Sequence, residues 1–233
     1  MSDKQNFHDD RDGNGLELLD LDSSWFDKVV TLQRTVIEDL MDHSMFYPLM
    51  PGEIERLLDG QGMSVGMVDS KGELVGYSAA YFPGKTQHNL GLDLGIAEEQ
   101  LDQVVHLEVS MVDPDHRSMG LQKMMYQYLL EQIKVLAKYR YVSSTVSPWN
   151  LSSLAGTLSL SLLIACLKPK YYGYWRYIFY QDLLEPVTID PGQIEITGLN
   201  DIDRQQQLLD QGHYGFEMRV EPAKVEVRWG RPT

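Results

Sequence analysis

Residues 104–136 read VVHLEVSMVDPDHRSMGLQKMMYQYLLEQIKVL, and this stretch decides the fold. Apolar and polar side chains alternate from residue 105 to residue 111, which is the period of a β-strand. Beyond the next loop, apolar side chains recur at the spacing of an amphipathic helix. They are Leu121, Met125, Tyr128, Leu129, Ile133 and Leu136. The stretch therefore predicts a strand over 104–112, a loop over 113–122 and a helix that runs to about residue 138.

The loop over residues 113–122 has the properties of an anion-binding site. Where a strand leads into a helix, the first helical N–H groups have no acceptor inside the helix, and the helix dipole adds partial positive charge. A diphosphate fits such a position. Gly120 lets a phosphate approach the main chain, and Arg117 can add a charge-assisted hydrogen bond. From the loop alone, an ordinary surface turn remains the alternative.

Arg117, Gly120 and Gln122 fall on the three positions of the pattern Gln/Arg-x-x-Gly-x-Gly/Ala. In this pattern the chain resembles the GNAT superfamily of acetyl-CoA-dependent N-acetyltransferases, in particular its bacterial members. Gln122 departs from the pattern, because it replaces a small residue and its amide can donate a hydrogen bond instead. Downstream, a predicted strand over 141–146 followed by Asn150 and Ser153 is similar to the fifth strand and fourth helix of the family.

The remaining elements are predicted from the same two periods and from turn residues. Further strands are expected over 16–21, 63–68, 74–81, 141–146, 175–184, 216–220 and 224–229. Further helices are expected over 22–40, 51–60, 97–103, 151–167 and 200–211. This order predicts a mixed α/β layout. The resemblance implies the GNAT acyl-CoA N-acyltransferase fold, an α+β-like arrangement in which helices cover both faces of a mixed, mostly antiparallel sheet with a splayed strand pair.

The 233 residues fit one large domain or one domain with a small appendage. Residues 1–15 are expected to be a flexible lead-in. The resemblance covers residues 16–184 and implies an N-acetyltransferase domain there. Residues 185–233 are expected to form a C-terminal extension, with a short helix and two strands, that packs on the same domain.

A formal net charge of -14 argues against nucleic acid and anionic lipid as partners, because such a surface repels phosphate groups. The same charge would attract a cationic amine, although acidity is also a common route to solubility. The N-terminal residues carry no apolar segment of the kind that a signal peptide needs, and no apolar run approaches the length of a membrane span. We therefore expect a cytoplasmic protein that does not bind membranes.

The single cysteine, Cys166, lies in an apolar run, which is typical of a buried and inert thiol. One cysteine excludes an internal disulfide. The six histidines show no paired metal-ligand spacing, so no metal is expected.

The resemblance implies acetyl-CoA as the co-substrate. Main-chain groups near Val109, Met111 and Val112 would pair with pantetheine, and Asn150 and Ser153 would meet its pantetheine and phosphate region. The pyrophosphate would be held by Arg117, Ser118, Met119, Gly120, Leu121 and Gln122.

The reaction implied is direct attack of a primary amine on the thioester in a ternary complex. The amine must be neutral, so a base is needed. Glu108 is the candidate base and His106 the reserve base, with a structural, hydrogen-bonded role for His106 as the alternative. Their polar strand face, which also carries Ser110, predicts a wet cleft, unless it is simply a solvated strand face.

Members of the family often use a tyrosine in the fourth helix as the acid, but this chain has Thr157 near that position. Tyr172 is then the candidate acid, although a packing aromatic explains it as well. Tyr47 and Asp93 are the candidates for contacting the acceptor, a small-molecule or peptide amine. Dimers are common in the family, so a homodimer remains open.

Two other functions remain open. One is a regulatory or interaction protein that binds CoA without turnover, and the other is an acyltransferase that uses another acyl group or another nucleophile.

Overall fold

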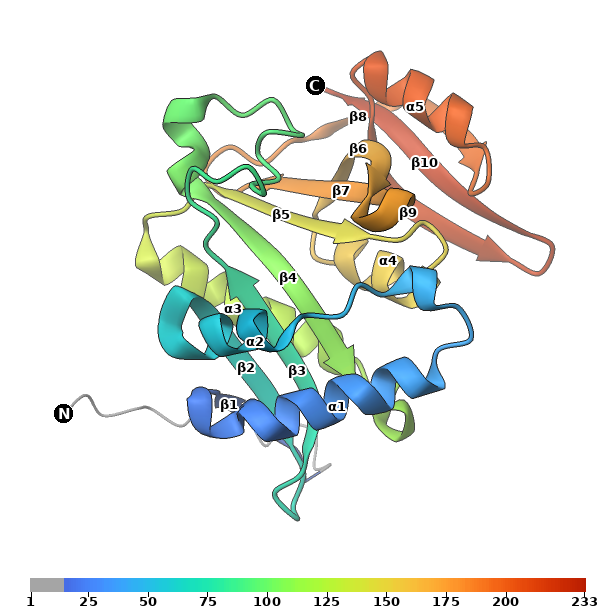
Figure 1. Cartoon of the computed structure of the whole chain (residues 1–233). Helices are drawn as coiled ribbons and strands as arrows, with labels where there is room; N and C mark the ends of the chain where they lie inside the picture. The colour runs from blue at the N-terminus through green and yellow to red at the C-terminus, as the bar shows by residue number, and fades with distance from the viewer. Residues whose placement is uncertain (1–14) are drawn as a thin grey trace. The chain divides into compact units, whose positions relative to one another are not determined.

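The computed structural model describes residues 15–233, so the expected lead-in lies outside the described residues apart from Gly15 (Figure 1). The chain folds into two compact units. The first comprises the described residues up to Phe82 together with Leu107–Val135, and the second comprises Pro83–His106 and Leu136–Thr233. The strand that decides the fold, β4 (Val104–Val112), begins in the second unit and continues in the first.

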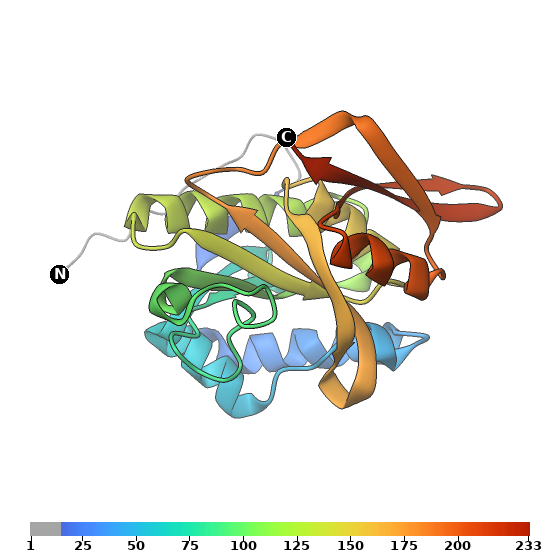
Figure 2. The ribbon, with the colours of Figure 1, turned by 90° about the horizontal axis from the view of Figure 1, so that it is seen from above.

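The first unit is a sheet covered by helices on both faces. Its strand order is β1-β2-β3-β4, and β1 and β3 both pair antiparallel with β2. Figure 1 and Figure 2 show α1 and α2 on one face and α3 on the other. The elements are β1 (Glu17–Asp20), α1 (Phe26–Asp39), α2 (Pro51–Arg56), β2 (Gly62–Val68), β3 (Leu74–Tyr81) and most of α3 (Leu121–Leu136).

The apolar face of β4 is buried in the core of the first unit. Val109 and Met111 pack in one cluster with residues of α1, α2 and β3, such as Val29 and Tyr77. On the opposite face, a Cβ added at Gly76 would lie 3.1 Å from Cε of Met125, so α3 lies close against the sheet there. These contacts fix the end of β4 from which the loop over residues 113–122 departs.

The second unit has the strand order β4-β5-β7-β6-β9-β10-β8. β4 and β5 pair in parallel over three residue pairs, from Val104 with Tyr141 to His106 with Ser143, and the other pairs are antiparallel. Its elements are β5 (Tyr141–Val146), α4 (Leu151–Leu158), β6 (Leu163–Lys170), β7 (Tyr174–Asp182), β8 (Ile189–Gly198), α5 (Ile202–Asp210), β9 (Tyr214–Glu221) and β10 (Lys224–Pro232). The predicted class, a mixed and mostly antiparallel sheet combined with helices, is confirmed.

The helix predicted over 151–167 is wrong in its second half. α4 ends at Leu158, Ser161 takes a left-handed φ of 64°, and β6 follows. β6 pairs with β7 on one edge and with β9 on the other. Its apolar side chains form a short continuous run, and such a run does not separate strand from helix.

The C-terminal extension has three strands where two were expected. The missed strand, β8, is exposed along most of its length, so it lacks the alternation that would mark it. β9 joins the extension to β6 through the pair Ile164 and Gly215, where an added Cβ would lie 2.9 Å from Cδ1 of Ile164. The division at residue 184 stays a prediction.

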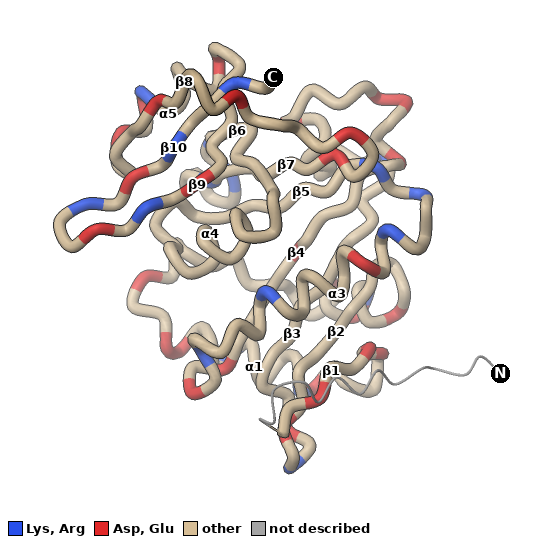
Figure 3. The backbone as a smooth tube through the Cα atoms, turned by 180° about the vertical axis from the view of Figure 1, so that it is seen from behind, with Lys and Arg blue, Asp and Glu red and all other residues tan. Residues whose placement is uncertain are grey.

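Figure 3 shows basic and acidic residues alternating along the β9–β10 hairpin. Glu217 contacts both Arg219 and Arg228, and Lys224 contacts both Glu221 and Glu226. Exposed pairs of this kind each contribute about 0–1 kcal/mol. The pairs therefore balance the charges along the hairpin but add little to its stability.

Gln205 of α5 ties the extension to β7. Its side chain is fully buried, donates to the carbonyl oxygens of Gly198 and Leu199 at 2.9 and 3.0 Å, and accepts from the hydroxyl of Tyr177 at 2.6 Å. The Gln205 amide therefore makes hydrogen bonds through both its nitrogen and its oxygen, and all three partners belong to the second unit.

We predict that Gln205→Ala lowers the free energy of unfolding by about 2–4 kcal/mol, because the Leu199 carbonyl and the Tyr177 hydroxyl each lose a buried hydrogen-bond partner. Urea denaturation measures this change. The control is Gln207→Ala on the exposed side of the same helix, which should change the value by less than about 0.5 kcal/mol. Equal effects of the two substitutions would show that the Gln205 contacts do not hold the extension.

Candidate active site

The loop that follows β4 is fixed at its start by polar contacts. The Asp113 amide donates to the Val75 carbonyl at 2.9 Å, and the Asp113 carboxylate accepts from the Asp115 amide at 3.0 Å. A 3-10 turn over Pro114–His116 follows, and the His116 ring lies 3.2 Å from the same carboxylate. Asp113 therefore determines where the following residues lie.

The backbone then bends sharply before α3. Ser118 has φ 64° and Gly120 has φ 75°, so two residues of the loop are left-handed. For Ser118 this conformation costs about 1–3 kcal/mol, a strain that is common at ligand sites. A Cβ at Gly120 would have no atom within 4 Å, and the helical hydrogen bonds begin with Met124 donating to the Gly120 carbonyl at 3.1 Å. A curved main chain before a helix is the geometry that binds anions.

Arg117, which is predicted to hold the pyrophosphate, contacts a carboxylate of α1. Its guanidinium donates to the carboxylate of Asp39 on α1 at 2.5 Å, and both side chains are 43% exposed. An ion pair this exposed contributes about 1 kcal/mol or less. Arg117 can therefore leave Asp39 for a stronger anion at little cost.

The three residues on the polar face of β4, His106, Glu108 and Ser110, lie in different surroundings. His106 is buried, and its Nε2 accepts from the Leu90 amide at 3.0 Å. Ser110 accepts from the Ser78 hydroxyl at 2.7 Å. Glu108 alone of the three is exposed. The Nε2 atom of His106 is thus engaged by a backbone amide, and the roles of Glu108 and His106 as bases stay predictions.

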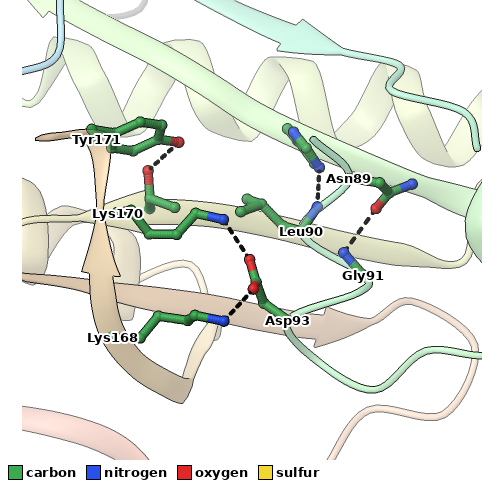
Figure 4. Close-up of polar contacts among 9 residues, drawn as sticks. Asn89, Leu90, Gly91, Asp93, Lys168, Lys170 and Tyr171 are labelled. Atoms are coloured by element: carbon green, nitrogen blue, oxygen red, sulfur yellow. Dashed lines mark hydrogen bonds and ion pairs between the residues drawn. The ribbon is translucent and has the colours of Figure 1, made fainter. Parts of the chain in front are cut away.

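The long connection between β3 and β4 is ordered by its own side chains (Figure 4). The buried Asn89 amide donates to the carbonyl oxygens of Gly84 and Leu101 at 2.6 and 3.0 Å, and its oxygen accepts from the Gly91 amide at 2.8 Å. Together with the bond from Leu90 to His106, these contacts hold the segment in one conformation.

Asp93, predicted to contact the acceptor, is already engaged by two cations. Lys168 and Lys170 of β6 each donate to one of its carboxylate oxygens at 2.6 Å (Figure 4). Burial raises the pKa of the Asp93 carboxyl, but the hydrogen bonds from the two lysines outweigh it and hold the pKa below the ordinary 3.8. The carboxylate is ionised and paired at neutral pH. Its role toward an acceptor stays a prediction.

The other predicted acid and acceptor residues lie in well-defined surroundings. Tyr172 is 89% exposed in the turn between β6 and β7, where it and Tyr171 have positive φ angles of 62° and 35°. Tyr47 is half-buried, in a segment that the Gln33 side chain anchors through two hydrogen bonds to the Leu49 backbone. Neither assignment is tested by these contacts.

Asn150 and Ser153 meet at the beginning of α4. The Asn150 side chain caps the helix by accepting from the Ser153 amide at 3.1 Å. Just before them, Ser147 is 2% exposed, and within the described residues its hydroxyl has no hydrogen-bond partner. Sequence reasoning missed Ser147, although a serine that follows a strand and precedes a helix cap was a usable signal. It also missed Lys168 and Lys170, whose spacing of two marks a strand.

Cys166, expected to be buried, is half-buried in β6, and burial raises the pKa of its thiol. Between residues 15 and 233, no cluster of three or more His, Cys, Asp or Glu side chains could hold a metal ion. No helix in the described part of the chain has the length and apolar character that crossing a membrane requires.

The family model described as acetyltransferase (GNAT) family matches residues 28–155. No curated protein matches the sequence. The chain is also similar in fold to three solved structures. Arabidopsis thaliana NAA60 in complex with acetyl-CoA is 14% identical, with a TM-score of 0.59 over 73% of this chain and 99% of that one. An N-acetyltransferase from Staphylococcus aureus is 13% identical, with a TM-score of 0.54 over 72% and 98%. An aminoglycoside acetyltransferase in complex with coenzyme A and kanamycin is 11% identical, with a TM-score of 0.54 over 72% and 95%.

We predict that Asp93→Asn lowers the free energy of unfolding at pH 7 by about 1–3 kcal/mol, because two charge-assisted hydrogen bonds are lost. The pKa of Asp93 is lowered in the folded state, so its stabilisation is present above pH 3.8 and is lost as the pH falls below that value. Urea denaturation at pH 7 and near pH 3 should show the gap between wild type and variant closing in acid. Asp210→Asn, at an exposed position, is the control; a gap that does not depend on pH would contradict the assignment.

Proposed function

The chain belongs to the GNAT family of acetyltransferases, and we propose that it transfers the acetyl group of acetyl-CoA to a primary amine by direct attack in a ternary complex. The family match spans α1, β4, the loop that follows it and the beginning of α4. The observation that carries the proposal is the left-handed bend at Ser118 and Gly120 immediately before α3. A strained loop that curves the backbone at a helix N-terminus suits a diphosphate.

The donor is proposed to lie on this loop and along β4. The pyrophosphate would accept hydrogen bonds from the amides of residues 118–122. Arg117 would leave Asp39 and bind the pyrophosphate instead. Because β4 pairs with β5 over three residues only, main-chain groups near Val109, Met111 and Val112 can pair with pantetheine as an added strand would. The unpartnered hydroxyl of Ser147 supports a polar ligand contact near Asn150 and Ser153.

In the proposed reaction, Glu108 takes a proton from the attacking ammonium, directly or through water. The amine nitrogen then forms a bond to the thioester carbon, the carbon–sulfur bond breaks, and coenzyme A leaves as the thiolate, which takes the second proton of the nitrogen directly or through water. A thiolate is a good leaving group, so an acid such as Tyr172 is helpful rather than required. Thr157, fully buried in α4, cannot replace the family tyrosine as an acid because an aliphatic hydroxyl is too weak.

The proposed acceptor is a small-molecule or peptide amine. Kanamycin in one related structure is an example of the small-molecule kind. The net charge of -14 favours encounter with an ammonium group. A homodimer and a cytoplasmic location remain predictions. Binding of CoA without turnover is the alternative that Gln122 and Thr157 favour, and release of free thiol with an amine would exclude it.

We predict that Gly120→Ala weakens acetyl-CoA binding about tenfold in titration calorimetry, since the new methyl group would protrude where a phosphate approaches. Gly72→Ala is a matched control, because Gly72 has φ 80° and, like Gly120, no atom within 4 Å of an added Cβ. Both substitutions should cost about 1–2 kcal/mol of stability. Equal acetyl-CoA affinities of the two variants would contradict the site.

We further predict that Glu108→Gln lowers kcat about 100-fold or more while leaving the affinity for acetyl-CoA unchanged, because the amide cannot accept the proton. Thiol release in steady state measures kcat. Glu55→Gln, an exposed position on α2, should behave like the wild type. Retention of wild-type kcat by Glu108→Gln would remove Glu108 from the mechanism.

A further inference from the structure

Two lysines converge on one carboxylate in the second unit, which is unusual for so acidic a chain. Lys168 and Lys170 both bond Asp93, and neither has another acidic partner among the described residues. Two other ion-pair clusters of this unit differ from each other: Arg140 contacts both Asp182 and Glu185, whereas Glu217 contacts both Arg219 and Arg228. The Lys168–Asp93–Lys170 cluster therefore carries a net positive charge that the neighbouring carboxylates do not compensate.

The strand register adds a third cation to this face. Lys168 lies directly opposite Arg176 on β7, so the two side chains project from the same side of the sheet. Like charges directly opposite each other destabilise a strand pair. Arg176 is buried and stacks near the rings of Tyr171 and Tyr174, at 5.8 and 6.0 Å. It also donates to the Trp175 carbonyl oxygen at 2.9 Å. The lysine pair therefore lies on a face of the sheet that carries three cationic residues.

The cluster is sheltered, yet it retains hydrogen-bond donors. The side chains of Asp93, Lys170 and Lys168 are 13%, 23% and 42% exposed. Each ammonium has three N–H groups and uses one of them on Asp93. The remaining donors belong to side chains that are partly shielded from water, where a charge-assisted hydrogen bond is stronger than at an open surface.

We propose that Lys168 and Lys170 bind the anionic group, a carboxylate or a phosphate, of the acyl acceptor. The acceptor would then be an amine that also carries an acidic group, such as an amino acid or a phosphorylated amine. This inference rests on the proposed acetyl transfer. It also agrees with the overall charge, because the acidic surface attracts the ammonium end of such a zwitterion while the lysine pair holds the other end.

The adjoining turn supports a ligand at this place. Tyr171 directly follows Lys170, and both Tyr171 and Tyr172 have left-handed backbones. Strain of this kind is maintained at ligand clamps. The Tyr171 hydroxyl lies 3.3 Å from the Thr145 hydroxyl (Figure 4). The Tyr172 side chain is exposed and can cover the body of a ligand. Asp93 is a positioning residue, because it sets the two ammonium groups side by side against their mutual repulsion.

The test compares matched acceptors that differ only in their acidic group. Amino acids are paired with their amides, and O-phosphoethanolamine is paired with ethanolamine. We expect the wild type to prefer the acidic member of a pair, with kcat/KM higher by about tenfold or more. The Lys168→Gln/Lys170→Gln variant should lose this preference, with kcat/KM for the neutral member and KM for acetyl-CoA unchanged within about twofold.

Two further variants serve as controls. Adding Asp93→Asn to the double variant removes all three charges, so the carboxylate that would have lost its partners is gone as well. If this triple variant also loses the preference for acidic acceptors, an unpaired Asp93 cannot be the cause. Lys224→Gln removes a lysine that is ion-paired on the β9–β10 hairpin and should keep the wild-type preference.

Equal kcat/KM for both members of every pair in the wild type would overturn the inference and leave acetyl transfer standing. If the proposed acetyl transfer itself is wrong, the result is different. No amine then causes thiol release, but calorimetry still shows that acidic amines bind to the wild type and not to the Lys168→Gln/Lys170→Gln variant. Inorganic phosphate or acetate binding as tightly as the acidic amines would also overturn the inference, because the site would then recognise a free anion and not an acceptor.

Discussion

The function proposed for this chain depends on one constraint: the backbone must bend to the left-handed region at Ser118 and Gly120 so that amides at the start of α3 face an anion. The first unit is built to hold that bend. The apolar face of β4 is fixed in the core by α1 and α2, Asp113 anchors the loop to Val75, and Met125 packs α3 against the sheet at Gly76. Arg117 rests on Asp39 in an exposed ion pair that a diphosphate can displace.

The second unit organises polar side chains in a different way. Asn89 and His106 hold the long connection before β4, and Asp93 joins that connection to two lysines of β6. A chain with a net charge of -14 thus contains a local cationic cluster. The combination suits a zwitterionic acceptor, since overall charge governs encounter and local charge governs which group is bound.

Alternation predicted β4, whose polar face is partly exposed, and two apolar runs around a turn predicted the β2–β3 hairpin, which is buried on both faces. β3 and β4 were predicted with their observed bounds, β2 begins one residue before the predicted residue 63, and α3 begins at Leu121, inside the loop predicted over 113–122. β6 could not be recognised, because its apolar run matches a buried helix as well as a strand, and the exposed β8 shows no pattern at all. The loop residues were identifiable from their motif. The partners of Arg117, His106 and Asp93 come from distant parts of the chain, which no local pattern reveals.

The most direct test of the central claim is a titration of the protein with acetyl-CoA, followed through the backbone amide resonances. The account predicts that the largest shifts occur at Met119, Gly120 and Leu121, where a diphosphate would accept hydrogen bonds. Binding that leaves these amides unshifted, or the absence of any binding, would contradict it.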